Sequence, residues 1–111
     1  MATIHYSPLS IDDLKSIHEY IASNLKSPLA AHNTASAITE RIRGLESAPE
    51  LGTPLSAICD FNSDYRFLVV NNYLVFYRFE ADSVYIIRIL YGRMNYLSIL
   101  FDGTKEDDTI E

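Results

Sequence analysis

Two apolar segments separated by a pair of asparagines decide the fold of this 111-residue chain. The stretch reads Tyr65-Arg66-Phe67-Leu68-Val69-Val70-Asn71-Asn72-Tyr73-Leu74-Val75-Phe76-Tyr77-Arg78. Both segments are rich in β-branched and aromatic residues, which favour strands. Because asparagine tolerates a positive φ, Asn71-Asn72 predicts a two-residue hairpin turn between strands at 65–70 and 73–79.

A third strand is expected at 84–90, after a second two-residue turn at Ala81-Asp82, and Gly92 ends it. The predicted cross-strand pairs are Val70 with Tyr73, Leu68 with Val75, Arg66 with Tyr77, Phe79 with Val84, Tyr77 with Ile86, and Val75 with Arg88. Because side chains alternate between the two faces of a sheet, this register places Arg66, Tyr77 and Arg88 on one face. We assign the other, more aromatic face to the helices, so the face with the arginines is expected to be partly open.

The N-terminal half predicts a short strand at 2–6 followed by two helices. Each helix begins at a Ser-Pro pair, Ser7-Pro8 and Ser27-Pro28, where serine suits the cap and proline the first helical position. Apolar residues follow in each case with helical spacing. The order is that of an α+β fold, in which an N-terminal strand and an antiparallel two-helix hairpin pack on a small antiparallel β-sheet. We expect one domain over residues 1–101, ending in a helical turn or short strand at 96–101, and then an acidic tail at 102–111.

The net charge of −6 is unevenly distributed along the chain. Asp102–Glu111 contains five acidic residues and one lysine, so the other 101 residues carry a net charge of only −2. The composition excludes a protein that coats nucleic acid by charge alone, although a local basic site stays compatible with it.

Several other classes are excluded by simple features of the sequence. The single cysteine, Cys59, cannot form an internal disulfide. The apolar runs are too short to span a bilayer, and the N-terminus lacks the pattern of a signal peptide. No Cys/His spacing indicates zinc and no glycine-rich loop indicates a nucleotide phosphate. We therefore expect a cytoplasmic protein without metal or cofactor.

Three arginines are the candidate functional residues on the sheet. Arg66 and Arg88 share the predicted open face, and Arg93 follows the third strand directly, so the three are expected near one end of the sheet. A guanidinium offers a planar fork to phosphate or carboxylate. One interpretation is an anion or RNA site; the other is that Arg66 and Arg88 form structural ion pairs with acidic neighbours, namely Asp60, Asp64 or Glu80.

At this point the sequence resembles a known family. The stretch 65–78 and the later Ile87-Arg88-Ile89-Leu90-Tyr91-Gly92-Arg93-Met94-Asn95-Tyr96 are similar to the RelE/ParE toxins of type II toxin–antitoxin modules. The helical half, with Asp13-Leu14, Tyr20-Ile21, Pro28 and Ala30-Ala31, agrees with this resemblance, which covers about residues 4–101. It implies a toxin that inhibits bacterial growth and is neutralised by a cognate antitoxin protein.

The resemblance implies two possible activities. RelE-like members cut mRNA on the ribosome without a metal, by attack of a 2′-hydroxyl on the adjacent phosphate, and the matching catalytic residues here are Arg66, Arg93 and Tyr96. ParE-like members poison DNA gyrase and have no hydrolytic site. For either target, the expected anion- or target-binding residues are Arg66, Tyr77, Arg88, Tyr91 and Arg93, whereas the antitoxin-binding residues stay open, with an apolar groove beside Leu14, Ile17 or Leu45 as one possibility.

The chain departs from the nuclease pattern at the groups that move protons. Tyr91 stands where many relatives have histidine, Asn95 stands where some nucleases have it, and no lysine occurs between Lys26 and Lys105. Glu50 and Tyr96 are then the remaining candidates for a general base. These departures favour a ParE-like or otherwise non-nuclease toxin, with a RelE-like nuclease and a non-toxic antitoxin-binding homologue as alternatives. The acidic tail is expected to be a solvated end, or else a segment that masks the arginines.

Overall fold

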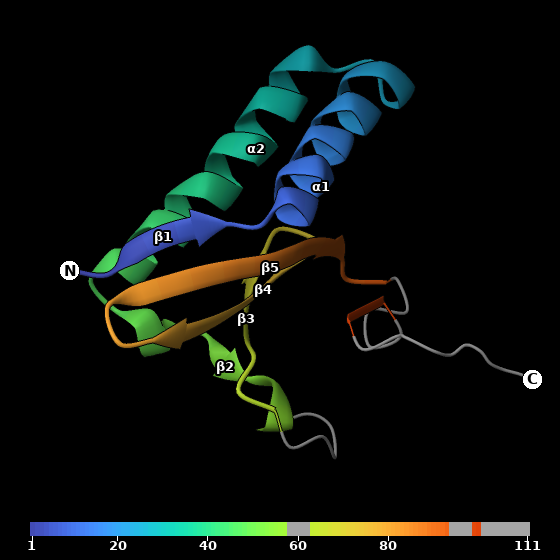
Figure 1. Ribbon diagram of the computed structural model, residues 1–111. Coiled ribbons are helices and arrows are strands. Elements are labelled where there is room, and N and C mark those ends of the chain that lie inside the picture. The colour runs from blue at the N-terminus through green and yellow to red at the C-terminus, as the bar shows by residue number, and fades with distance from the viewer. Residues whose placement is uncertain (58–62, 94–98, 101–111) are drawn as a thin grey trace, which may run out of the picture.

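The chain forms one layer of two helices packed on a five-stranded sheet in the computed structural model, which describes residues 1–57, 63–93 and 99–100 (Figure 1). The strands are β1 (Thr3–Tyr6), β2 (Thr53–Pro54), β3 (Arg66–Val70), β4 (Tyr73–Glu80) and β5 (Ser83–Tyr91). The helices are α1 (Pro8–Glu19), which continues as a π-helical turn η1 (Tyr20–Asn24), and α2 (Pro28–Arg43). Short 3-10 turns follow at η2 (Gly44–Glu46), η3 (Pro49–Leu51) and η4 (Leu55–Ala57).

The strand order in the sheet is β1-β5-β4-β3-β2. The hairpin β3–β4 has the predicted register, with Val70 opposite Tyr73, and Asn71 has the positive φ of 55° that the turn requires. β1 lies parallel to β5, so the sheet is mixed, whereas its other four strands are antiparallel. The predicted α+β class with an N-terminal strand and a two-helix hairpin is confirmed.

Both helices begin where the Ser-Pro pairs predict. The Ser7 hydroxyl accepts a hydrogen bond from the Ser10 N–H at 3.0 Å, and the Ser27 hydroxyl accepts one from the Ala30 N–H at 3.2 Å. Each serine thus satisfies one of the unpaired N–H groups of its helix end. Because only a short turn separates η1 from α2, the helices run antiparallel and side by side over the same face of the sheet (Figure 1).

The helices cover the face of the sheet opposite to the one that we assigned to them. Leu68, Val70, Val75 and Tyr77 pack in one core with helix residues. The remaining buried members of this core are Ile17, Ile21, Ala31, Ile38, Ile42, Leu45, Val84, Ile86 and Ile89. The aromatic face is buried too, by Leu55, Ile99 and Leu100 packing around Phe76 and Leu90. The prediction of a partly open face with the arginines is therefore wrong, because two separate segments cover the two apolar faces.

A β-bulge in β5 changes the predicted register. Tyr77 pairs with Ile86 as predicted, but Phe76 pairs with Arg88, so Ile87 is an extra residue in β5. The predicted pair of Val75 with Arg88 is wrong, and Val75 lies opposite Ile89 instead. An extra residue reverses the alternation of side chains beyond it, so Ile89 faces the helices and Arg88 does not continue the row of Tyr77.

The central helix–sheet core predicts a large cost for removing a buried side chain. Ile38 of α2 is fully buried, whereas Leu29 of the same helix is 71% exposed. We expect Ile38→Ala to lower the free energy of unfolding by about 3 kcal/mol, because the change loses burial and leaves a cavity. Leu29→Ala, the control, is expected to change it by less than about 0.5 kcal/mol. Urea unfolding followed by circular dichroism measures both, and equal effects would contradict this packing.

Candidate functional site

Arg66 and Tyr77 lie opposite each other on β3 and β4 and together hold the segment at 49–52. The Tyr77 hydroxyl donates to the Pro49 carbonyl at 2.7 Å and accepts from the Gly52 N–H at 2.8 Å. The Arg66 guanidinium donates to the Gly52 carbonyl at 2.8 Å and to the Glu50 carbonyl at 3.3 Å. Both side chains therefore act as structural donors to a loop backbone.

Gly52 is fitted closely against this pair of side chains. A Cβ atom built at Gly52 lies 2.6 Å from the Tyr77 hydroxyl oxygen and 2.8 Å from the Phe67 carbonyl oxygen. No real Cβ atom approaches these groups so closely, so any larger residue displaces the loop. Arg66 in addition lies 5.5 Å from the centre of the Phe79 ring, which gives its charge a favourable aromatic face.

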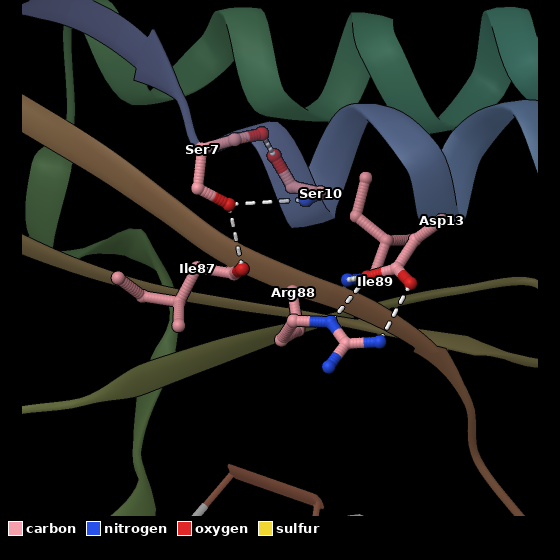
Figure 2. Close-up of polar contacts among 6 residues, drawn as sticks. All are labelled: Ser7, Ser10, Asp13, Ile87, Arg88 and Ile89. Carbon is pink, nitrogen blue, oxygen red and sulfur yellow. Dashed lines mark hydrogen bonds and ion pairs between the residues drawn. The ribbon is translucent and has the colours of Figure 1, made fainter.

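Arg88 forms a bidentate ion pair with Asp13 of α1 (Figure 2). The distances are 2.7 Å from Nε and 2.8 Å from the terminal nitrogen to the two carboxylate oxygens. The Asp13 side chain is only 12% exposed and that of Arg88 21%. The hydrogen bonds to Asp13 raise the pKa of Arg88, so this guanidinium is a fixed cation that is already neutralised by its partner.

The same carboxylate closes the edge of β5 where β1 has ended. β1 pairs with β5 only as far as Tyr6 opposite Ile86. Ser7 takes over next, since its N–H donates to the Ile86 carbonyl and its hydroxyl to the Ile87 carbonyl (Figure 2). One step further, the Ile89 N–H donates to Asp13 at 3.0 Å. The start of α1 thus replaces a neighbouring strand along this edge.

Beyond this ion pair, a groove lies between α1, η1 and the ends of β4 and β5. It has a volume of about 330 Å³, and its walls include Ile17, Tyr20, Tyr73, Arg88 and Tyr91. Tyr73 and Tyr91 contact edge to face, with ring centres 5.7 Å apart. A second hollow of about 470 Å³ shares these tyrosines and Tyr20 and continues toward Leu25 and Asn72. We call this surface the tyrosine groove; Ile17 lies on its wall, whereas Leu45 is fully buried in the core.

The structure does not bring the three predicted arginines together. Arg66 is level with Tyr77 on β4, whereas Arg93 follows Gly92, whose N–H donates to the Asn72 carbonyl at the other end of the hairpin. Five residues of extended chain separate these levels, roughly 16 Å. Arg93 is exposed and makes no hydrogen bond or ion pair with any residue that the structure describes. Tyr96, like Cys59 and the acidic tail, lies outside the described residues.

Of the three acidic residues predicted as partners of Arg66 and Arg88, Asp64 and Glu80 bind Arg78 instead, and Asp60 lies outside the described residues. Arg78 donates to Asp64 at 3.0 Å and to Glu80 at 2.8 Å, and these hydrogen bonds raise its pKa. Arg88 therefore forms a structural ion pair, as the second interpretation of the arginines predicts. Its partner is Asp13, however, and not one of the three acidic residues predicted. The only signal for Asp13 in the sequence is that it lies four residues before Ile17, and therefore on the same face of the helix.

Two further searches cover the described part of the chain. Among residues 1–57, 63–93 and 99–100, no three His, Cys, Asp or Glu side chains are grouped so that they can hold a metal ion. Within the same ranges no helix is long and apolar enough to cross a membrane.

The comparisons with known proteins agree with this architecture. Residues 4–96 match the family model described as the ParE toxin of the type II toxin–antitoxin system parDE. The chain belongs to the ParE toxin family. Twelve chains of solved structures match it, and one is from the chromosomal ParDE TA system of P. aeruginosa. That chain is 18% identical, with a TM-score of 0.68 over 82% of this chain and 96% of its own length, which supports the fold. A search of curated proteins gives no match.

The ion pair between α1 and β5 predicts a strong dependence of stability on Asp13. Asp13→Ala leaves the Arg88 guanidinium and the Ile89 N–H without their acceptor in a mostly buried place, so we expect a loss of about 3 kcal/mol in the free energy of unfolding. The control is Glu40→Ala, which removes an exposed ion pair with Arg43 and should cost less than about 0.5 kcal/mol. Urea unfolding measures both, and a small effect of Asp13→Ala would show that the edge does not need this carboxylate.

The burial of three tyrosines predicts a loss of stability at alkaline pH. Burial raises the pKa of Tyr6, Tyr73 and Tyr77 above the ordinary value of 10.0. Above pH 10 the unfolded chain loses these protons while the folded chain keeps them, so the stability present below that pH decreases as the pH rises through the folded pKa values. Urea unfolding between about pH 8 and pH 11 should show this decrease, and Tyr77→Phe should show a smaller one. A flat profile would contradict the assignment.

Proposed function

We propose that this ParE-family toxin inhibits growth by binding DNA gyrase rather than by cutting RNA, and that a cognate antitoxin protein neutralises it. The observation that carries the proposal is the structural use of Arg66, the residue matched to the phosphate-binding arginine of the nuclease members. Its guanidinium is bonded to the Gly52 and Glu50 carbonyls. A phosphate on Arg66 would have to compete with both backbone acceptors.

The second support is that residues 63–93, which include Arg66, contain no histidine or lysine that could transfer a proton. Cleavage by a 2′-hydroxyl needs one group to take a proton and another to give one. Among residues 63–93 the sequence contains neither histidine nor lysine. Of the chain's histidines, His5 stacks on Tyr85 of β5 at 5.1 Å between ring centres, and His18 and His32 are exposed on the helices. Strands β3, β4 and β5 therefore offer arginines and phenols for binding, but no histidine or lysine.

Of the two candidate bases, Glu50 is exposed on η3 and its backbone carbonyl accepts from Arg66, whereas Tyr96 lies outside the described residues. Tyr77, which faces Arg66, is fully buried, its pKa is raised by burial, and its hydroxyl already donates to Pro49 and accepts from Gly52. With Arg88 paired to Asp13, Arg93 and Tyr91 are the exposed members of the predicted target-binding set. The surface is better suited to contacting a macromolecule than to hydrolysing one.

Induction of the chain in cells tests the mechanism. A gyrase-binding toxin is expected to arrest growth, induce the DNA-damage response and cause gyrase-linked DNA breaks, while translated mRNA stays intact. Purified gyrase supplies the direct measurement, since the chain should inhibit the supercoiling activity of the enzyme. Arg93→Ala should weaken this inhibition, and Arg41→Ala, an exposed arginine of α2, is the matched control.

Each other outcome assigns a different activity. If the chain cleaves mRNA on the ribosome and Arg66→Ala abolishes this cleavage, the proposal is overturned in favour of a RelE-like nuclease. Normal growth with intact mRNA and normal supercoiling, despite soluble folded protein, would instead identify a non-toxic homologue that only binds the antitoxin.

A further inference from the structure

Beyond β1, a short length of the β5 edge next to the tyrosine groove has no strand paired with it among the described residues. Paired residues of antiparallel strands alternate between those bonded to each other and those whose polar groups point away. The Gly92 N–H donates to Asn72 of the hairpin, and the Ile89 N–H points away to Asp13. By this alternation the Tyr91 N–H and C=O and the Ile89 C=O also point away from β4. None of them has a hydrogen-bond partner among the described residues.

An unpaired strand edge is a template for another strand. Along most of β5 this template is used, because β1, Ser7 and Asp13 occupy it in turn. At Ile89–Tyr91 it is left unpaired within the part of the chain that the structure describes. The edge groups there can hold about three residues of an extended segment by main-chain hydrogen bonds.

The tyrosine groove lies directly beside this free edge and supplies the side-chain contacts. Its walls at Ile17, Leu90 and the three tyrosines are mainly apolar, and Tyr20 and Tyr91 are 52% and 39% exposed. A strand added to an edge turns alternate side chains to one face of the sheet. One such side chain, if apolar, enters the groove and covers the tyrosine rings.

Charge restricts the occupant further. Asp13 is neutralised by Arg88 at the inner end of the groove, whereas Arg93, two residues beyond Tyr91, is exposed without a partner among the described residues. A segment that runs along Ile89–Tyr91 and leaves the groove therefore passes the Arg93 guanidinium, a cation without a partner among the described residues. An acidic side chain at that point of the segment neutralises the Arg93 guanidinium.

We propose that β5 at Ile89–Tyr91 and the tyrosine groove bind an extended segment of the antitoxin, with an apolar residue in the groove and an acidic residue on Arg93. This inference rests on the proposed neutralisation by an antitoxin. Because Tyr91 and Arg93 also belong to the predicted target-binding set, antitoxin affinity is measured separately from toxicity, and Tyr20 tests the antitoxin surface alone.

The main-chain contact can be tested separately from the side chain of Tyr91. Tyr91→Pro removes the outward N–H and leaves the hydrogen bonds to β4 intact, since that N–H does not point to β4; Tyr91→Ala removes the ring and keeps the N–H. The probe is the full-length cognate antitoxin, titrated calorimetrically against each folded variant. We expect Tyr91→Pro to bind about tenfold more weakly than Tyr91→Ala, as for the loss of one hydrogen bond.

The contributions of the tyrosine groove and of Arg93 to antitoxin binding are tested with matched control variants. Tyr20→Ala should weaken antitoxin binding at least tenfold, as for an aromatic residue at the centre of an interface, whereas Val69→Ala, 57% exposed on β3, should leave it unchanged. Arg93→Glu should weaken binding, and Arg41→Glu on α2 should not. In cells, the Tyr20→Ala variant should stay toxic while escaping neutralisation.

Three results would overturn the inference. Equal affinity of Tyr91→Pro and Tyr91→Ala would exclude strand addition, and unchanged affinity of Tyr20→Ala would exclude the groove, in both cases without affecting the gyrase proposal. Loss of toxicity in Tyr20→Ala with unchanged antitoxin binding would assign this surface to the growth-inhibiting target instead. Folding of each variant is checked by its urea unfolding midpoint, and Tyr20→Phe, which keeps the ring, should restore binding.

Discussion

The carboxylate of Asp13 is the point on which the arrangement of helices and sheet depends. It accepts from the Arg88 guanidinium at two oxygens and from the Ile89 N–H, so one side chain neutralises a mostly buried cation and satisfies a strand edge. Because these contacts lie where β1 ends, they fix α1 against β5 beyond the reach of main-chain pairing. The position of Tyr20 opposite Tyr73 and Tyr91 follows from this attachment, and with it the groove between them.

The local elements of the fold could be predicted because they depend on neighbouring residues. Serine caps, a proline at the first helical turn and an asparagine turn act within four residues, and each occurs where expected. The covered face of the sheet could not be predicted from its composition, since both faces are apolar and both are buried. The bulge at Ile87 has no local signal either, so a register correct at Ile86 became wrong at Arg88.

The candidate site shows the same division between chemistry and geometry. The sequence correctly indicates arginines and phenols as the polar groups of the sheet, but a guanidinium takes whichever carboxylate the fold brings to it. Arg88 pairs with a residue 75 positions away, and the nearby Asp64 and Glu80 bind Arg78. Arg66 binds carbonyl groups, which no charge pattern reveals. Residue type thus limits what a site can do, while partner assignment needs the packed structure.

A fold that uses its arginines for internal bonds gives up the mobile cations of a nuclease and gains a rigid surface. Arg66 and Tyr77 hold one loop, Arg88 holds one helix, and each bond would have to break before the side chain could follow a reacting phosphate. Binding of a macromolecule has no such requirement, because affinity benefits from contacts that are in place before the partner arrives. The residues left for that role lie at the end of β5, where Tyr91 and Arg93 combine an aromatic surface with main-chain groups and a charge that have no partner among the described residues.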